Sequence, residues 1–324
     1  MKLLLRLRGR FVSFYKKHIF VVGYFLRLVF VLIVLLLFRP RMEYNELLSQ
    51  NWFVLAFSVV SAFIPTRFLP LTVIAYISFQ IMSLSTGIGA AVLIVLIVMY
   101  LLYFRINPDY ALLIILLPAL TMIRLPLLAV LVLALTTPFN SIFAVLAGHI
   151  TYYLIHYVDI NAAVFSGIID SLESEVTELN MLGIMVYGFF TYKEFLYSTF
   201  TVLAVFVITY YVKKIYINRS NDMAAVIGTG TYIIFMIAFN LVFNTITVVR
   251  LATIVVGSIV SLILALLAEN IALPLDYSRT EFLEFEDEEY YYYVRAVPKT
   301  NLDREVVSVK QINRRVKKEE KGET

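Results

Sequence analysis

The chain has 324 residues, of which 61% are hydrophobic and only 15% are charged, with a formal net charge of +4 at pH 7. Soluble domains usually contain about 25% charged residues, so this composition excludes an ordinary soluble domain. Cysteine is absent, which excludes disulfides and thiolate chemistry. We therefore predict an all-α polytopic membrane protein, surrounded by the lipid bilayer.

The first 18 residues are basic and amphipathic, and a long apolar run follows them. A secretory signal peptide would have a shorter apolar run that ends at a small-residue cleavage site. We expect residues 1–18 to form a retained cytoplasmic leader and residues 19–269 to form the transmembrane domain. Basic loops that orient membrane helices account for the net charge, so we expect no nucleic-acid partner.

Six apolar runs are long enough to cross the roughly 30 Å hydrocarbon core of a bilayer as helices. They cover residues 19–38, 87–104, 141–158, 195–212, 223–243 and 246–268. Two further apolar stretches, 52–84 and 110–137, contain prolines within 64–70 and 118–126. Proline ends or kinks a helix, so each stretch is predicted to form a pair of short helices. Each pair is either two thin spans, giving up to ten spans, or one re-entrant hairpin.

The two broken stretches resemble each other along the chain. In 52–104 and again in 110–158, an arginine and a Leu-Pro pair precede a short apolar helix, a polar turn and a full span. Paired interrupted segments often mark the midplane site of a transporter built from inverted repeats. The alternative is a coincidence between two proline-broken hydrophobic segments.

Loop charges predict the orientation in the membrane. The leader and the loop after Lys213 are basic, whereas residues 159–181 are acidic and contain no Lys or Arg. The positive-inside rule therefore places both termini in the cytoplasm and the acidic loop outside, as in a bacterial cytoplasmic membrane. Arg39, Arg41 and Arg124 do not fit the cytoplasmic side in the ten-span arrangement.

Several arginines occur within or beside the apolar runs, where a charge costs about 2.5–3.5 kcal/mol. Arg67 and Arg124 lie at the helix breaks and are candidate ligands for an anionic solute or a lipid head group; backbone and water solvation is the competing interpretation. Arg27 and Arg250 lie nearer to span ends and are expected to extend toward the interface. Glu194 is adjacent to Lys193, so the arginines have no evident acidic partner, which argues against a cation pathway.

A polar stripe is predicted on the helix over residues 141–158. His149, Tyr153 and His156 are spaced at i, i+4 and i+7 and therefore share one face. The stripe either lines a polar cavity, where it relays protons, or makes a helix–helix contact. Two histidines without a carboxylate at ligand spacing do not make a metal site. Asn240 and Asn244, also at i and i+4, are predicted to form interhelical hydrogen bonds.

Sequence motifs for catalysis are absent. The chain contains no G-x-S-x-G, H-E-x-x-H, Walker A or G-x-G-x-x-G motif. We therefore expect neither an enzyme nor a cofactor or metal site.

The composition changes after Glu269. Residues 270–312 are predicted to form a β-rich cytoplasmic tail with strands near 281–285, 290–297 and 305–312, followed by a disordered charged end at 313–324. The tail has too few residues to bury a core alone, so we expect it to contact a protein partner or a second copy. The candidate contact residues are Tyr290, Tyr291, Tyr292, Tyr293 and Arg295.

The tail segment PLDYSRTEFLEFEDEEYYYYVRAVPK resembles that of uncharacterised multi-pass membrane proteins of clostridial-type Firmicutes. This resemblance implies a bacterial cytoplasmic membrane and no particular activity. The segments INPDYALLIILLPAL and SIFAVLAGHITYYL are similar to the rod-shape accessory protein MreD and to substrate-binding membrane subunits of vitamin transporters. That similarity implies a scaffold or accessory subunit.

Two functions follow from these patterns. The first is a transporter or permease-like protein with an anion site where the broken stretches of Arg67 and Arg124 meet. The alternative is a non-transporting scaffold of a cell-envelope or secretion complex that docks partners through its tail.

Overall fold

A computed structural model of the chain describes residues 17–106, 111–166, 178–215, 219–245, 247–272, 281–286 and 291–296, together with Phe14 and Pro108. Six of the described helices are long and apolar enough to cross a membrane. They are Ile19–Arg41, Thr86–Ile106, Phe139–Ile160, Lys193–Lys213, Ser220–Val242 and Val248–Glu269. Each coincides with a predicted span to within a few residues, so the prediction of an all-α polytopic protein is confirmed.

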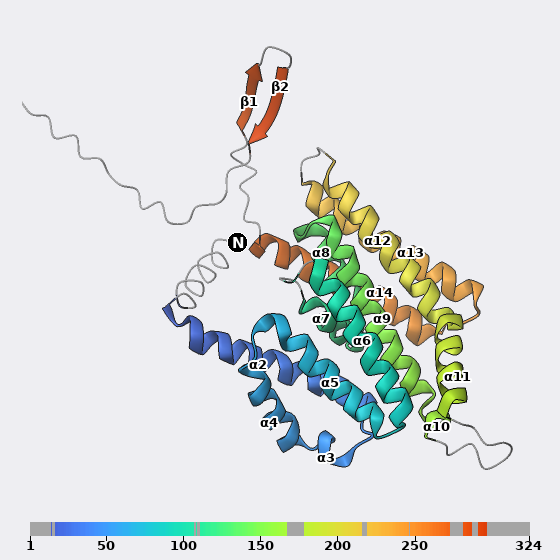
Figure 1. Cartoon of the computed structure of the whole chain (residues 1–324). Coiled ribbons are helices and arrows are strands. Elements are labelled where there is room, and N and C mark those ends of the chain that lie inside the picture. The colour runs from blue at the N-terminus through green and yellow to red at the C-terminus, as the bar shows by residue number, and fades with distance from the viewer. Residues whose placement is uncertain are drawn as a thin grey trace, which may run out of the picture. The chain divides into compact units, whose positions relative to one another are not determined.

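Figure 1 shows the order of the elements. The long helices, with the 3-10 turns η1 and η4 that adjoin two of them, are α2 (Ile19–Phe38), η1 (Arg39–Arg41), α6 (Thr86–Ile106), η4 (Phe139–Ser141), α9 (Ile142–Ile160), α12 (Lys193–Lys213), α13 (Ser220–Val242) and α14 (Val248–Ala272). The shorter helical elements are α3 (Glu46–Ser49), α4 (Asn51–Ala62), η2 (Thr66–Phe68), α5 (Leu69–Met82), α7 (Leu113–Met122), α8 (Pro126–Thr136), α10 (Ala162–Phe165) and α11 (Glu178–Thr191).

Both broken stretches form two short helices. The first is α4 and α5, separated by η2, and the second is α7 and α8. Proline occupies a starting position of α5 and of α8, where its missing N–H costs no hydrogen bond. The second break falls at residues 123–125, within the predicted segment 118–126. Pro118 itself lies inside α7, which continues to Met122.

The described part of the acidic segment 159–181 contains short helical stretches, and its position outside the membrane stays a prediction. Helix α9 extends to Ile160, α10 follows it, and α11 begins at Glu178. Residues 167–177, most of the leader, the predicted third strand and the charged end lie outside the described residues.

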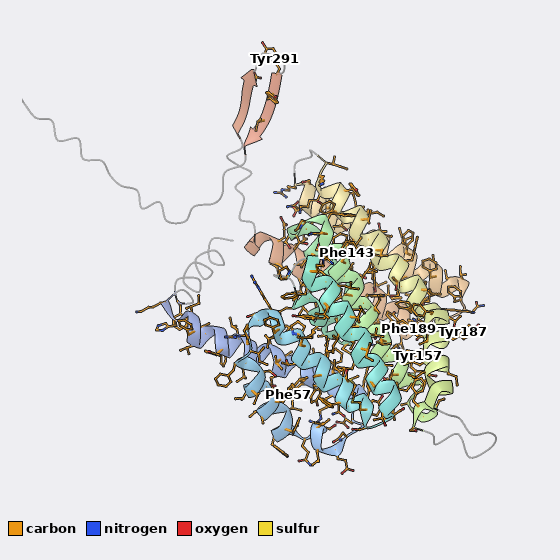
Figure 2. The ribbon with its side chains drawn as sticks, viewed as in Figure 1. Phe57, Phe143, Tyr157, Tyr187, Phe189 and Tyr291 are labelled. Carbon is orange, nitrogen blue, oxygen red and sulfur yellow. The ribbon has the colours of Figure 1, made fainter. Side chains whose placement is uncertain are left out.

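The described helices pack around two large buried clusters and a small third one of Leu135, Ala224 and Ala225. In Figure 1, α2, α4 and α5 lie on one side of α6, α7 and α9, while α12 and α13 lie on the other. One cluster joins residues of α2, α5, α6, α7 and α9, and the second joins residues of α8, α12, α13 and α14. Figure 2 shows Tyr157 of α9 beside Phe189 of α11, and their ring centroids are 6.1 Å apart. Helix α8 contacts both α12 and α14, which places the α7–α8 break next to α14.

Residues after the last helix include an antiparallel pair of strands, β1 (Glu281–Glu286) and β2 (Tyr291–Ala296). Its register pairs Leu283 with Val294 and Phe285 with Tyr292. The pair belongs to a unit separate from the helical part, Arg10–Leu273.

Gly148 of α9 generates a stability prediction. A Cβ atom there would lie 2.8 Å from Leu117 Cβ and 3.2 Å from the carbonyl oxygen of Leu113, both on α7. We expect Gly148→Ala to push α7 away from α9 and to destabilise the protein by about 1–3 kcal/mol, measured by unfolding of the purified protein in detergent. Gly230→Ala is the matched control, because a Cβ at Gly230 meets no atom within 4 Å. Equal stability of the two variants would contradict the close α7–α9 packing.

Candidate anion-binding cavity

A partly open cavity of about 230 Å³ lies among η1, the α7–α8 break, α9, α12, α13 and α14. Its wall brings together charged and aromatic side chains from parts of the sequence that are far apart. The charged and aromatic lining residues are Arg41, Arg124, Tyr152, Tyr153, His156, Glu194, Tyr232 and Arg250. Three of the four charged groups are therefore guanidinium groups.

Arg124 occupies an unusual position at the end of α7. Its φ is 63°, in the left-handed region that favours glycine. The Arg124 N–H donates to the carbonyl of Thr121 at 3.0 Å, and the Leu125 N–H donates to that of Leu120 at 2.9 Å. These two bonds make the helix ending known as the Schellman motif, with arginine at the position where glycine is most common. These bonds fix the backbone conformation of Arg124 just after the end of α7.

Helix α14 packs closely against this turn. A Cβ atom on Gly257 would lie 2.8 Å from the carbonyl oxygen of Arg124, so only glycine permits this approach. The guanidinium of Arg124 donates to the hydroxyl of Thr253 at 3.1 Å, one helical turn earlier on α14. The turn and its side chain are thus held against a single face of α14.

Arg41 enters the cavity from the end of the first span. In η1, Pro40 separates two arginines that have different partners: Arg39 pairs with Glu43 at 3.0 Å, whereas Nη1 of Arg41 lies 2.7 Å from Nδ1 of His156. A guanidinium group only donates, so Nδ1 of His156 accepts and carries no proton in this arrangement. Arg41 also lies over the ring of Tyr152, with 5.9 Å between its Cζ and the ring centroid.

Arg250 has an acidic partner that sequence reasoning missed. Its guanidinium forms an ion pair with Glu194 and donates to the hydroxyl of Tyr197 at 2.8 Å. Tyr192 donates to the other oxygen of Glu194 at 2.9 Å. A carboxylate from α12 therefore compensates the charge of Arg250, and its predicted extension toward the interface stays a prediction.

The charges of the cavity do not balance. Glu194 compensates Arg250, whereas the hydrogen bonds of Arg41 and Arg124 go to the neutral groups His156 and Thr253. Two positive charges therefore lack a carboxylate among the described residues. Planar guanidinium donors bind phosphate and carboxylate groups through paired charge-assisted hydrogen bonds, so the cavity has the chemistry of an anion site.

The deeper wall of the cavity adds hydroxyl groups. Ser258 and Ser261 of α14 are buried and line it, together with Tyr232 of α13. The Ser261 hydroxyl has no hydrogen-bond partner within the described part of the chain. A buried polar group without a partner is costly, so this hydroxyl is available to a ligand.

Of the five predicted ligand residues, Arg124, Tyr153 and His156 line the cavity, and two do not. His149 is buried within the bundle, and its ring lies 4.8 Å from that of Tyr153. Only Tyr153 and His156 of the predicted stripe therefore reach the cavity. Arg67 lies on η2, whose backbone is held by the Tyr100 hydroxyl at 2.8 Å, outside this cavity. The cavity thus forms without the expected contribution of Arg67.

The asparagine pair has a different role from the one predicted. The Asn240 amide donates to Met236 of the same helix at 2.6 Å, and its side-chain oxygen accepts from Thr245 at 2.8 Å. Asn244 has a φ of 54° and ends α13 in a second left-handed turn. The side-chain bonds of Asn240 therefore stay within α13 and the turn after it, and Asn244 lies in that turn.

The predicted contact residues of the tail lie on or beside β2. Tyr291 and Tyr292 are exposed, and Tyr293 and Arg295 pair in the ladder with Glu284 and Phe282. Tyr290 lies outside the described residues. Their predicted role in partner contact stays a prediction.

The described residues contain no group of three or more His, Cys, Asp or Glu side chains that could hold a metal ion. Comparison with protein-family models, with curated proteins and with solved structures found no match for this chain. The function is therefore inferred from the geometry and charge of the cavity alone.

The left-handed turn at Arg124 leads to a second stability prediction. Arg124→Gly relieves the strain of a non-glycine residue at this φ, worth about 1–2 kcal/mol, which offsets the lost bond to Thr253. Arg124→Ala loses the same bond and keeps the strain. We expect the glycine variant to be as stable as the native protein, and the alanine variant to be less stable than it by about 1 kcal/mol in detergent unfolding. A glycine variant that is no more stable than the alanine variant would contradict the left-handed backbone conformation at residue 124.

Proposed function

We propose that the chain is a transporter or permease-like integral membrane protein that binds an anion in the cavity. The observation that carries this proposal is the presence of three lining arginines against one glutamate. Charges within the membrane-spanning part of a protein are costly and normally compensated. An anionic ligand would compensate Arg41 and Arg124, which no described carboxylate does.

The lengths of the short helices support the re-entrant arrangement. Helix α7 has 10 residues and α8 has 11. At 1.5 Å per residue each is about 15–17 Å long, or about half of a 30 Å hydrocarbon core. We infer that α7 and α8 enter and leave on one side of the membrane. Helices α4 and α5 have 12 and 14 residues and are also shorter than a full span, so we infer a second re-entrant pair, beside six full spans.

Six spans with two re-entrant pairs place the two termini on one side, which loop charge assigns to the cytoplasm of a bacterial cell. The cavity would then face the opposite side, since α2 ends beside it and α12 and α14 begin beside it. The turn at Arg124 would reach it from the cytoplasmic side. A broken helix that meets the ends of full spans at a polar site is a common arrangement in transporters.

Anion binding tests this proposal. We expect Arg41→Gln and Arg124→Gly each to weaken the binding of phosphate, sulfate or a dicarboxylate by about tenfold or more, because each removes a charge-assisted hydrogen bond worth about 1.5–3 kcal/mol. The measurement is isothermal titration of the purified protein, followed by uptake of the anion that binds into proteoliposomes. Arg39→Gln is the matched control, since Arg39 belongs to the same turn but pairs with Glu43. Failure of the native protein to bind any of these anions would overturn the proposal.

Glu194→Gln is expected to act in the opposite direction. It removes the one carboxylate of the cavity lining and keeps a side chain that can bond to Arg250 and Tyr192. Anion affinity should rise by about fivefold, corresponding to about 1 kcal/mol of lost repulsion, in the same titration. A variant that binds anions more weakly than the native protein would contradict the assigned charge balance.

The alternative function is a membrane scaffold that docks a partner through its tail. One observation favours it: Tyr291, Tyr292 and Val294 of β2 are exposed, at 68%, 46% and 43%. An exposed strand with aromatic side chains is suited to edge addition by a partner strand or a second copy. Under this alternative, deletion of residues 276–324 abolishes partner recovery in pull-down from cells and leaves anion binding unchanged.

A further inference from the structure

A second hollow adjoins the cavity and differs from it in chemistry. It is a shallow groove of about 400 Å³ between α14 and the α7–α8 break. Ile123, Leu125, Ala252, Val256 and Val260 contribute its apolar side chains. Arg124, Thr253 and Gly257 belong to the lining of both hollows, so the groove begins at the rim of the arginine cavity.

The groove follows the axis of α14. Ala252, Val256 and Val260 are spaced four residues apart and therefore form one strip on the helix, about 12 Å long. The strip faces away from the bundle, since Val256 is 59% exposed and only 22% of the most apolar stretch of α14 is buried. In a bilayer such a surface contacts hydrocarbon.

The two hollows lie side by side along α14, and the charged end of the cavity lies where this helix begins. Arg250 and its partner Glu194 mark that end, the cavity wall continues to Ser261, and the apolar strip runs beside it from Ala252 toward the middle of the helix. A lipid has its charged head group at the membrane surface and its chains toward the middle. Arg124, at the shared rim, is placed to bind the head group from the side of the chain.

We propose that the cavity and the groove together hold one anionic lipid, with its phosphate between Arg41 and Arg124 and one acyl chain along the strip of α14. This inference rests on the proposed anion site and adds the class of ligand. Charge complementarity selects an anionic head group, and the adjoining apolar strip selects a ligand that carries a hydrocarbon chain. Water-soluble anions then bind to only part of the site.

Native mass spectrometry of the purified full-length protein tests the inference with three probes. Dioleoyl phosphatidic acid carries head group and chains, glycerol 3-phosphate carries the head group alone, and dioleoylglycerol carries the chains alone. We expect phosphatidic acid to bind at least tenfold more tightly than either of the others. Arg124→Gly should weaken its binding at least tenfold, because the guanidinium group is lost while the turn is kept.

A large side chain in the groove tests the contribution of the groove separately from that of the cavity. We expect Val256→Trp to weaken phosphatidic acid binding at least fivefold and to leave glycerol 3-phosphate binding unchanged. Ile263→Trp is the matched control, since Ile263 is also exposed on α14, at 53%, but lies outside the groove. Ala252→Phe provides a second groove variant if Val256→Trp does not fold.

Each contrary outcome has a distinct meaning. Equal affinity for phosphatidic acid and glycerol 3-phosphate would overturn the lipid inference and leave the proposed anion site intact. Equal affinity for phosphatidic acid and dioleoylglycerol would show general contact with membrane lipid and would also overturn the inference. Loss of phosphatidic acid binding in Ile263→Trp would also show general contact with membrane lipid and would overturn the inference. Binding of none of the three probes would overturn the lipid inference, and the titration with inorganic anions and a dicarboxylate would decide the proposed function separately.

Discussion

The left-handed turn at Arg124 is the constraint on which the cavity depends. It ends α7 inside an apolar stretch, starts α8 at Pro126 and leaves an arginine beside the face of α14 that carries Gly257. Glycine would adopt this backbone without strain. Strained residues of this kind persist where surrounding structure holds them, and they cluster at functional sites. An arginine at this position fits the proposed use of its side chain in the cavity.

The class of ligand that suits the cavity depends on which of its arginines have a carboxylate partner. The ion pair of Arg250 with Glu194 joins α14 to α12 and leaves little charge to offer a ligand. Arg41 and Arg124 come from two other elements and bond to neutral groups. Two uncompensated guanidinium groups would repel each other in a medium of low dielectric constant, and a bound anion removes that repulsion. The same argument holds for a soluble anion and for a lipid phosphate.

The spans could be predicted from the sequence because bilayer thickness fixes the length of an apolar helix. The breaks followed from proline, except that Pro118 is accommodated within α7. The site was only partly predictable, since helical periodicity shows which residues share a face but not which helix that face meets. Arg41 and Glu194 were missed for that reason. One signal pointed to Arg41: Arg39, Arg41 and Arg124 all fit poorly to the cytoplasmic side in the ten-span arrangement. Arg41 and Arg124 line the cavity, whereas Arg39 pairs with Glu43.

The central claim is that Arg41 and Arg124 share one bound anion. An experimental structure of the protein with tungstate, an electron-dense oxyanion, tests this claim most directly. The account predicts a single strong peak within hydrogen-bond distance of both guanidinium groups, at the rim that the cavity and the groove have in common. A cavity without such a peak at saturating tungstate, or a peak bound only by surface lysines elsewhere, would contradict it.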